Sequence, residues 1–483
     1  MPDEPKGSLT VLDRKSDKSE VAALIAALME RGRRAQKIAA GYDQEMTDLL
    51  VAAAGWAIME PSRNRELAEL AIAETGLGNV QDKIAKNHRK TLGLLRDLKG
   101  ARSVGIIAET PETGIVEIAR PVGVVAAITP STNPGATPAN KIINALKGRN
   151  AVILAPSPKG WGVCARFAAF IHAEFDKIGA PHDLVQLLPA PVTKEATLEL
   201  MRQADLVVAT GSQANIRAAY ASGTPAFGVG AGNVAGIVDG SADLGLAAEM
   251  IARSKTFDNA TSCSSENSLI LDSAIHEPML AALARQGGVL LDAAERERLQ
   301  AALFPGGKLA PGLIAKDAPC IAASAGLDHP RLRDARFLMV TESGFGPEHP
   351  FSGEKLSPVL ALYRAESFED AMRIVEGIYA YQGAGHSVGL HSRDEAQAVE
   401  LGLRLPVARV IVNQAHCIAT GGSFDNGLPF SLSMGCGSWG RNSSTDNLNF
   451  RHFLNITRIS RRIPERIPDE AEIFSAYFAR AGR

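Results

Sequence analysis

The sequence predicts an α/β protein built on parallel sheets. Beyond residue 104, short apolar segments rich in β-branched residues alternate with amphipathic helical segments. Strands and helices repeated in that order are typical of βαβ units. The pattern restarts near Val238, and 483 residues are too many for one ordinary core. We therefore expect two α/β domains that join around residues 233–241.

The segment from residue 17 to about residue 100 is predicted to form helices. Apolar residues between Val21 and Met29 recur at helical spacing. A second helix ends at Pro61, where a third begins. The third is expected to stop at Gly76, because glycine readily adopts the left-handed conformation that ends a helix.

The remaining elements follow in alternation. Strands are expected at 104–109, 114–130, 150–156, 183–189, 205–210, 268–272, 336–340, 359–365, 387–392, 408–413 and 453–460. Helices are expected at 138–148, 162–179, 193–203, 241–257, 277–287, 366–378 and 395–405, with Ser241 as an N-cap. Residues 421–447 are rich in Gly, Ser and Asn and are predicted to form a functional or mobile loop. After the strand at 453–460 we expect only a polar end.

The composition argues against several classes of protein. The net charge is −2 and the basic residues are scattered, so no nucleic-acid partner is expected. The N-terminus lacks the pattern of a signal peptide and no run of eighteen apolar residues occurs, so we expect a cytoplasmic protein without membrane contact. Five cysteines without a CxxC do not form a disulfide framework, and ten histidines without HxxxH or HExxH predict no metal site.

One cysteine lies in a polar loop, in the stretch FDNATSCSSENSLIL at 257–271. Cys263 follows a predicted helix and precedes a strand, whereas Cys164 lies in mid-helix among apolar residues. A thiol must be accessible and able to ionise in order to react. The residues alone leave two interpretations of Cys263 open, a nucleophile or a buried loop thiol.

Two further loops carry candidate groups. In ITPSTNPGATP, Asn133 lies between Pro130 and Pro134, which restrict the backbone, so its amide could donate to a developing oxyanion or simply form a turn. In LVVATGSQANIRAAY, a strand runs through Thr210, Gly211 and Ser212 into a helix whose N-terminal amides suit a phosphate. The glycine-rich loop GVGAGN at 228–233 is weaker evidence, because a strand rather than a helix follows it.

Taken together, these segments resemble the aldehyde dehydrogenase superfamily. The motifs are FDNATSCSSE, ITPSTNP, ATG…AAYASGTPAFGVGAGN, EKLSPVLALY and GCGSWGRNS, in the family's order between about residues 20 and 460. More narrowly they are similar to its CoA-acylating branch, which includes acetaldehyde and propionaldehyde dehydrogenases.

The resemblance implies a role for each candidate residue. Cys263 would attack the aldehyde, and the amide of Asn133 with the backbone N–H of Cys263 would hold the oxyanion. Glu354, in EKLSP, matches the glutamate that holds the nicotinamide ribose, although a solvated loop carboxylate is the alternative. Thr210, Gly211 and Ser212 match the turn near the pyrophosphate.

The release of the acyl group is predicted from a missing carboxylate. Hydrolytic members carry a glutamate that activates water, but the matching segment here is Gly228-Val229-Gly230-Ala231-Gly232. A thiol ionises far more easily than water, so coenzyme A is the expected acceptor, with ping-pong kinetics. Glu266 is an alternative base, but we interpret it as a structural carboxylate. A hydrolytic enzyme that releases free acid is the rival hypothesis.

The cofactor preference depends on the segment Ala155-Pro156-Ser157-Pro158-Lys159. Hydrolytic members usually have Lys-Pro-Ser-Glu there. Without that glutamate nothing repels a 2′-phosphate, and Ser157 and Lys159 could contact one, unless Lys159 is only a solvated cation. The cofactor is therefore NAD or NADP, with a slight preference for NADP.

The aldehyde is expected to be small and polar. Thr261 and Ser262 are polar where this branch usually has aliphatic residues. The whole chain is also similar to acylating sulfoacetaldehyde dehydrogenases, so sulfoacetaldehyde is the favoured substrate. Acetaldehyde, glycolaldehyde and succinate semialdehyde are the alternatives.

The resemblance also implies a domain plan. The expected parts are a Rossmann-type cofactor domain (1–105, 126–237 and part of 421–447), a catalytic domain (238–420) and an oligomerisation flap (106–125 and 448–483). Because a flap of this kind buries its edge against a neighbouring subunit, a homodimer or homotetramer is expected.

Overall fold

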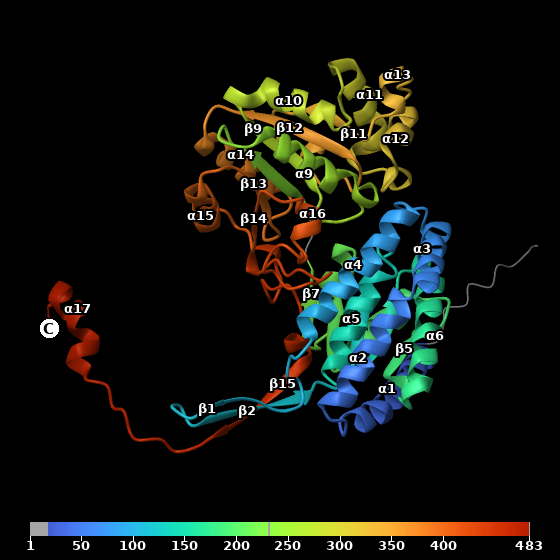
Figure 1. The fold of residues 1–483 in the computed structure, drawn as a ribbon, viewed down its shortest axis with the longest axis vertical. Coiled ribbons are helices and arrows are strands. Elements are labelled where there is room, and N and C mark those ends of the chain that lie inside the picture. The colour runs from blue at the N-terminus through green and yellow to red at the C-terminus, as the bar shows by residue number, and fades with distance from the viewer. Residues whose placement is uncertain (1–17, 230–231, 483) are drawn as a thin grey trace, which may run out of the picture.

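The structure is a computed structural model that describes residues 18–229 and 232–482. Figure 1 shows two bodies, each with a sheet between helices, and a narrow third sheet from which a C-terminal arm extends. The predicted α/β class, with its parallel sheets, is confirmed.

Four N-terminal helices cover part of the first body. They are α1 (Lys18–Ala39), α2 (Gln44–Met59), α3 (Pro61–Thr75) and α4 (Val80–Leu98). As predicted, α3 begins at Pro61, and Gly76 ends it with a left-handed φ of 65°. Asn79 caps α4 by accepting a hydrogen bond from the backbone N–H of Asp82.

The first body contains a five-stranded parallel sheet with the order β5-β4-β3-β6-β7. Its strands are β3 (Val124–Thr129), β4 (Ala151–Pro156), β5 (Val185–Leu187), β6 (Leu206–Ala209) and β7 (Ala226–Gly228). Its helices are α5 (Ala136–Lys147), α6 (Trp161–Ile178), α7 (Lys194–Gln203) and α8 (Gln213–Ala221). The strand order reverses between β3 and β6, which makes that junction the topological switch point. Val124 and Val125 pair with β4 here, two residues before the predicted start of this domain segment.

The second body contains a seven-stranded parallel sheet with the order β10-β11-β12-β9-β8-β13-β14. Its strands are β8 (Val234–Val238), β9 (Glu266–Asp272), β10 (Gly288–Leu290), β11 (Phe337–Thr341), β12 (Val359–Ala365), β13 (Val388–His391) and β14 (Val410–Val412). Its helices are α9 (Leu244–Thr256), α10 (His276–Arg285), α11 (Ala293–Leu303), α12 (Ala318–Ser324), α13 (Pro330–Arg333), α14 (Phe368–Tyr381), α15 (Glu395–Arg404) and α16 (His416–Ala419). Successive side chains of β9 enter opposite cores, Leu269 and Leu271 on one face and Ile270 on the other.

The start of α9 corrects one sequence prediction. Asp243, not Ser241, is the N-cap, because its carboxylate accepts a hydrogen bond from the backbone N–H of Leu246 at 3.1 Å. The Ser241 hydroxyl instead donates to Asp239 Oδ2 at 2.5 Å. The stronger acceptor two residues further on therefore sets the boundary.

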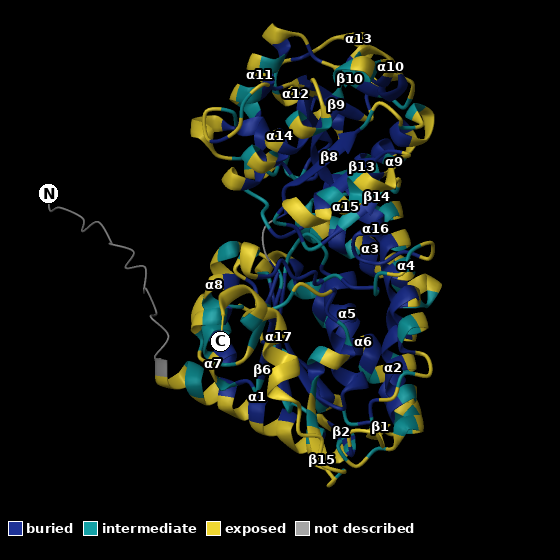
Figure 2. Cartoon of the chain, turned by 90° about the vertical axis from the view of Figure 1, so that its left-hand side faces the viewer, coloured by how far each residue is buried: buried dark blue, intermediate teal, exposed yellow. Residues whose placement is uncertain are grey.

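The third sheet is antiparallel and projects from the first body (Figure 1), where Arg149 Nη2 donates to the carbonyl oxygen of Ala119. Its strands are β1 (Gly105–Thr110), β2 (Ile115–Pro121) and β15 (Leu454–Ser460), with β2 in the middle. Beyond it the arm ends in α17 (Glu470–Ala481), which the sequence reading missed, since only a polar end was expected there. Figure 2 shows this helix as exposed, and its Ile473, Phe474 and Tyr477 face solvent.

Candidate active site

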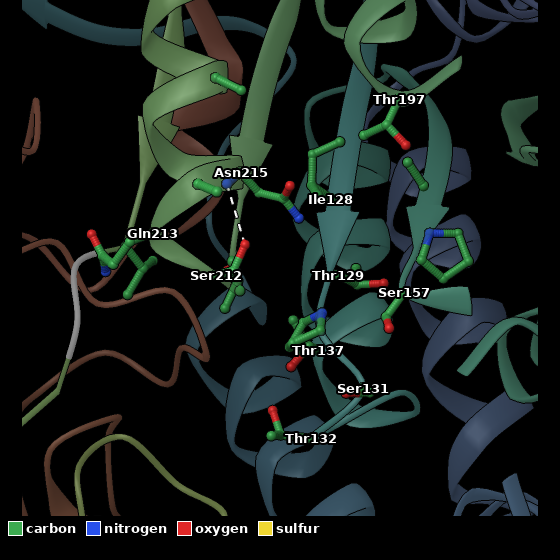
Figure 3. A pocket seen from close by; sticks show the side chains of 18 of the residues that line it. Ile128, Thr129, Ser131, Thr132, Thr137, Ser157, Thr197, Ser212, Gln213 and Asn215 are labelled. Atoms are coloured by element: carbon green, nitrogen blue, oxygen red, sulfur yellow. Dashed lines mark hydrogen bonds between the residues drawn. The ribbon is translucent and has the colours of Figure 1, made fainter. Parts of the chain in front are cut away.

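A cleft of about 1110 Å³ lies at the switch point of the first sheet and reaches the second body. Loops that follow β3, β4 and β6 form one wall, as Figure 3 shows for Ser131, Ser157 and Ser212. Cys263 and Glu354 of the second body line the other side. Parallel α/β sheets bind ligands at such switch points, so the fold places the ligand site where the predicted residues meet.

Cys263 lies in this cleft together with Asn133. The cysteine is partly exposed, and its Sγ is 3.6 Å from His386 Nε2. Burial, Glu354 and Cys436 raise the pKa of Cys263 to about 12, with Arg409 opposing them only weakly. Without ligands, Cys263 is therefore a thiol at neutral pH.

The loop before Cys263 has an unusual backbone. Asp258, Asn259 and Ala260 have φ values of 51°, 51° and 57°. The Asp258 carboxylate fixes this conformation by accepting hydrogen bonds from Lys83 at 3.1 Å and from Lys86 at 2.5 Å. Burial alone would raise the pKa of Asp258, but the two lysines outweigh it and hold that pKa below its ordinary value. The ion pairs thus offset the cost of the left-handed backbone conformation at residues 258–260, which sets the direction of the loop that carries Cys263.

Gly78 makes this arrangement possible. It has a left-handed φ of 80°, and a Cβ there would come within 1.8 Å of Asp258 Oδ1. Any side chain at this position would expel the Asp258 carboxylate from its place.

The same lysine orients Asn133. Lys86 Nζ donates to Asn133 Oδ1 at 2.8 Å, and an ammonium group can only donate, so the amide oxygen must face it. The NH₂ group of Asn133 has no hydrogen-bond acceptor among the described residues. It is therefore free to donate to an oxyanion formed at Cys263.

A chain of hydrogen bonds runs from the nucleophile into the second body. His386 Nδ1 lies 2.7 Å from Ser387 Oγ, which lies 2.8 Å from His416 Nε2. Burial and then Arg409 lower the pKa of His386 to about 3, so its imidazole is neutral at physiological pH and contacts the thiol as a hydrogen-bonding partner rather than as a strong base. The sequence reading missed this chain. Its only local signal is a Gly-His-Ser sequence before the strand at Val388–His391.

The predicted cofactor residues lie on the opposite side of the cleft, with one exception. Thr210, Gly211, Ser212 and Ser157 all line it. Ser212 caps α8 by accepting a hydrogen bond from the backbone N–H of Asn215 at 3.3 Å (Figure 3). Lys159 is exposed and does not belong to the lining.

Glu354 suits a dinucleotide. Its carboxyl group lines the cleft without a hydrogen-bond partner among the described residues, and burial raises its pKa to about 8. A sugar hydroxyl could satisfy it, so the residues at the switch point fit a nicotinamide dinucleotide, which would accept a hydride there.

The segment with the missing carboxylate abuts the nucleophile. Gly230 and Ala231 lie outside the described residues, but a Cβ on Gly232 would come within 1.9 Å of the carbonyl oxygen of Cys263. No side chain fits at Gly232. Glu266 is buried in β9, where it accepts from Ser254, and it lines neither this cleft nor the adjoining pocket.

Residues 18–229 and 232–482 contain neither a metal-binding cluster nor a membrane-spanning helix. No group of three or more His, Cys, Asp or Glu there could hold a metal ion. No helix of this part of the chain combines the length and apolarity needed to span a membrane.

A switch-point cleft that ends at a cysteine and an amide donor defines a cysteine-dependent oxidoreductase of the α/β class. Comparisons with known proteins identify the family within this class. The model of the aldehyde dehydrogenase family matches residues 18–289. This chain belongs to the aldehyde dehydrogenase family, and within it to the CoA-acylating branch.

Three relatives illustrate the match. A sulfoacetaldehyde dehydrogenase (acylating) of Cupriavidus necator is 64% identical, over 99% of this chain and 96% of its own. A succinate-semialdehyde dehydrogenase (acetylating) of Clostridium kluyveri is 39% identical, over 93% and 98%. The crystal structure of an acetylating aldehyde dehydrogenase from Geobacillus thermoglucosidasius has a TM-score of 0.89 at 35% identity, over 94% of this chain and 99% of that one.

Proposed function

We propose that this protein oxidises a small aldehyde with an anionic tail, sulfoacetaldehyde first, to its CoA thioester. The observation that carries the proposal is that Cys263 and Asn133 line one end of the cleft while Gly232, packed on Cys263, leaves no room for a water-activating side chain. The 64% identity to the Cupriavidus necator enzyme favours sulfoacetaldehyde over acetaldehyde, glycolaldehyde and succinate semialdehyde.

The proposed reaction has two halves. In the first, Cys263 loses its proton to solvent, with His386 Nε2 beside the sulfur, and the thiolate attacks the aldehyde carbon. The carbonyl electrons move to oxygen, where Asn133 and the backbone N–H of Cys263 hold the charge. A nicotinamide held in the cleft would accept the hydride from this carbon, and a thioester would remain on Cys263.

In the second half, the thiolate of coenzyme A attacks the thioester and releases the Cys263 thiolate. Water is the rival acceptor and would require a base. Glu354, whose pKa burial raises to about 8, is a carboxyl group of the cleft wall that could serve. We assign it instead to the nicotinamide ribose, with Thr210, Gly211 and Ser212 near the pyrophosphate.

We infer that NADP is accepted as well as NAD. Glu354 is the sole carboxylate among the lining residues that the structure describes, and Ser157 at the end of β4 leaves room for a 2′-phosphate. Changing Ser157 to Glu should raise the KM for NADP and leave that for NAD nearly unchanged, as initial rates with each cofactor would show.

We further propose that the three-stranded sheet and the arm after it join neighbouring subunits. The outer strands β1 and β15 are largely exposed, and α17 presents Ile473, Phe474 and Tyr477 to solvent. Unpaired strand edges and such apolar patches are usually covered by a partner. A homodimer or homotetramer is expected, and sedimentation equilibrium would measure it.

One panel tests the catalytic proposal. Sulfoacetaldehyde, succinate semialdehyde, glycolaldehyde and acetaldehyde are assayed with NAD or NADP by absorbance at the reduced-cofactor band, with and without CoA. We expect the highest kcat/KM with sulfoacetaldehyde and turnover only with CoA. Free acid formed at a comparable rate without CoA would favour the hydrolytic alternative, and an equal rate with acetaldehyde would end the preference for sulfonate.

A further inference from the structure

A second cavity adjoins the cleft beside the nucleophile. It has a volume of about 190 Å³ and shares Asn133, Ser262, Leu432 and Met434 with the cleft. We call it the basic pocket. Because Asn133 and Ser262 belong to both linings, the two cavities meet next to Cys263.

The pocket is strongly cationic. Lys86, Arg89 and Lys90 enter it from one face of α4, at the i, i+3, i+4 spacing that places side chains together. Arg253 enters it from the last turn of α9. No Asp or Glu is among the residues that line it.

Two of these cations already have partners. Lys86 is held by Asp258, Thr261 and Asn133, and Lys90 donates to the carbonyl oxygen of Gly421 at 2.8 Å. Burial lowers the pKa of Lys90 to about 7, so it is only partly charged at neutral pH, and neither lysine offers a free hydrogen-bond donor.

The two arginines are less satisfied. Arg89 donates to the Ser423 hydroxyl at 2.7 Å and more loosely to the carbonyl of Ile418. Arg253 has no hydrogen bond or ion pair with any residue that the structure describes. Burial and then the proximity of Arg253 lower the pKa of Arg89, a sign that the two guanidinium groups repel each other. Both arginines help to lower the pKa of the Asp425 carboxylate, so it lies near them. Asp425 is exposed, however, and accepts a hydrogen bond from the Ser423 hydroxyl.

We propose that the basic pocket binds the anionic tail of the aldehyde, a sulfonate or a carboxylate, with Arg253 and Arg89 as its ligands. This inference rests on the proposed function and adds the group that selects the substrate. An anion placed there would relieve the repulsion between the arginines, and the planar guanidinium fork suits both oxyanions. Ser262 and Ser264, whose hydroxyls lie 2.8 Å apart at the pocket wall, can donate to it as well. This would explain why Ser262 and Ser264, the residues on either side of Cys263, are polar.

Arg253→Gln tests the pocket with little risk to folding, because Arg253 is exposed and has no hydrogen bond or ion pair with a described residue. We expect kcat/KM to fall about 10- to 100-fold for sulfoacetaldehyde and succinate semialdehyde, mainly through KM, and to change less than about twofold for acetaldehyde. Arg89→Gln should act in the same direction. Arg285→Gln, an exposed arginine of α10 outside both linings, is the matched control. Equal losses for charged and neutral aldehydes, or no loss, would overturn the proposal.

A second readout does not require turnover. Alkylation of Cys263 by iodoacetate and by iodoacetamide is followed by mass spectrometry of its peptide, which separates it from the exposed Cys320. Relative to a free thiol, we expect iodoacetate to be favoured at least about fivefold at low salt, and the preference to shrink with added salt and in Arg253→Gln. A ratio equal to that of the free thiol would count against the pocket.

The two proposals fail in different ways. If the wild-type enzyme prefers acetaldehyde but iodoacetate still reacts preferentially, the assignment of substrate is wrong and the anion site stands. If sulfoacetaldehyde is preferred but Arg253→Gln and Arg89→Gln leave that preference intact, the function stands and the basic pocket is not its cause.

Discussion

The cleft and the basic pocket meet at Asn133 and Ser262, yet they are built and charged differently. The cleft is formed by loops at the ends of parallel strands, and most of its lining is uncharged. The basic pocket is formed by faces of α4 and α9 and by the loop after α16, and four basic residues but no Asp or Glu line it. The cleft is a general feature of the fold, whereas the pocket depends on particular side chains. Changes at the shared boundary, or at a residue that positions it, should therefore affect every substrate, and other changes inside one cavity should affect only its own ligand.

The largest effect is expected at the nucleophile. In Cys263→Ser, kcat/KM should fall by about 10⁴ or more for both charged and neutral aldehydes, because a hydroxyl is a far weaker nucleophile than a thiolate. Thermal unfolding should be nearly unchanged. The same replacement at the exposed Cys320 is the control and should have no effect. Residual turnover above about one tenth would show that Cys263 is not the nucleophile.

Asn133 lies on the boundary and should also affect all aldehydes. Asn133→Ala is expected to lower kcat by about 10²–10³ with little change in KM, the usual consequence of losing one oxyanion donor. Asn133→Asp keeps the shape and the contact with Lys86 but places a negative charge beside the oxyanion, so its loss should be at least as large. An active Asp variant would contradict the assigned role.

The state of the thiol gives a third prediction. The pKa of Cys263 is raised to about 12, so its reactive thiolate is a minor species that grows tenfold per pH unit. Alkylation by neutral iodoacetamide without cofactor should therefore rise about 100-fold between pH 7 and pH 9 and continue to rise. A small free thiol levels off near its own pKa of about 8.5. A plateau for Cys263 below pH 9 would show that the thiolate is already stabilised before ligands bind.

The sequence predicted the framework because buried parallel strands have a distinct composition. In β3, every residue from Val124 to Thr129 is buried, so the strand is a continuous apolar run that loop residues follow at once. Cys263, Asn133, Ser157 and Ser212 were found for the same reason, since each follows a recognisable strand or helix. Their roles, however, came from the resemblance to a family and not from spacing.

The sequence could not predict the groups that support these residues. Lys83 and Lys86 look like part of a solvated helix face, and they become structural only because α4 turns that face toward Asp258, 175 and 172 residues away. His386 is likewise 123 residues from Cys263. Contacts at such separations leave no local pattern, so the lysines, the histidine chain and the basic pocket were visible only in the fold.

A change at Lys86 can separate the positioning of the Asn133 amide from the selection of charged aldehydes. Lys86 lines the basic pocket, but its ammonium group donates a hydrogen bond to Asn133. In Lys86→Met we expect kcat to fall about tenfold for charged and neutral aldehydes alike, since the freed amide no longer points at Cys263. Combined with Asn133→Ala, the same change should cost less than about twofold more, because the two residues act as one unit. Additive losses would mean that Lys86 acts elsewhere. Lys37→Met, on the exposed face of α1, is the control.

The smallest effect is expected for Glu354, which lies in the cleft alone. Glu354→Gln keeps an acceptor but replaces a carboxyl group that can ionise when a sugar hydroxyl donates to it, a loss of about 1 kcal/mol, so the KM for NAD or NADP should rise about fivefold. The KM for sulfoacetaldehyde and the ratio of charged to neutral aldehydes should not change, in contrast to Arg253→Gln. Glu348→Gln, on a nearby exposed loop, is the control. If Glu354→Gln instead abolished a slow release of free acid and left the cofactor KM unaltered, Glu354 would be the base of a hydrolytic side reaction, and the cleft would then do more than hold the cofactor.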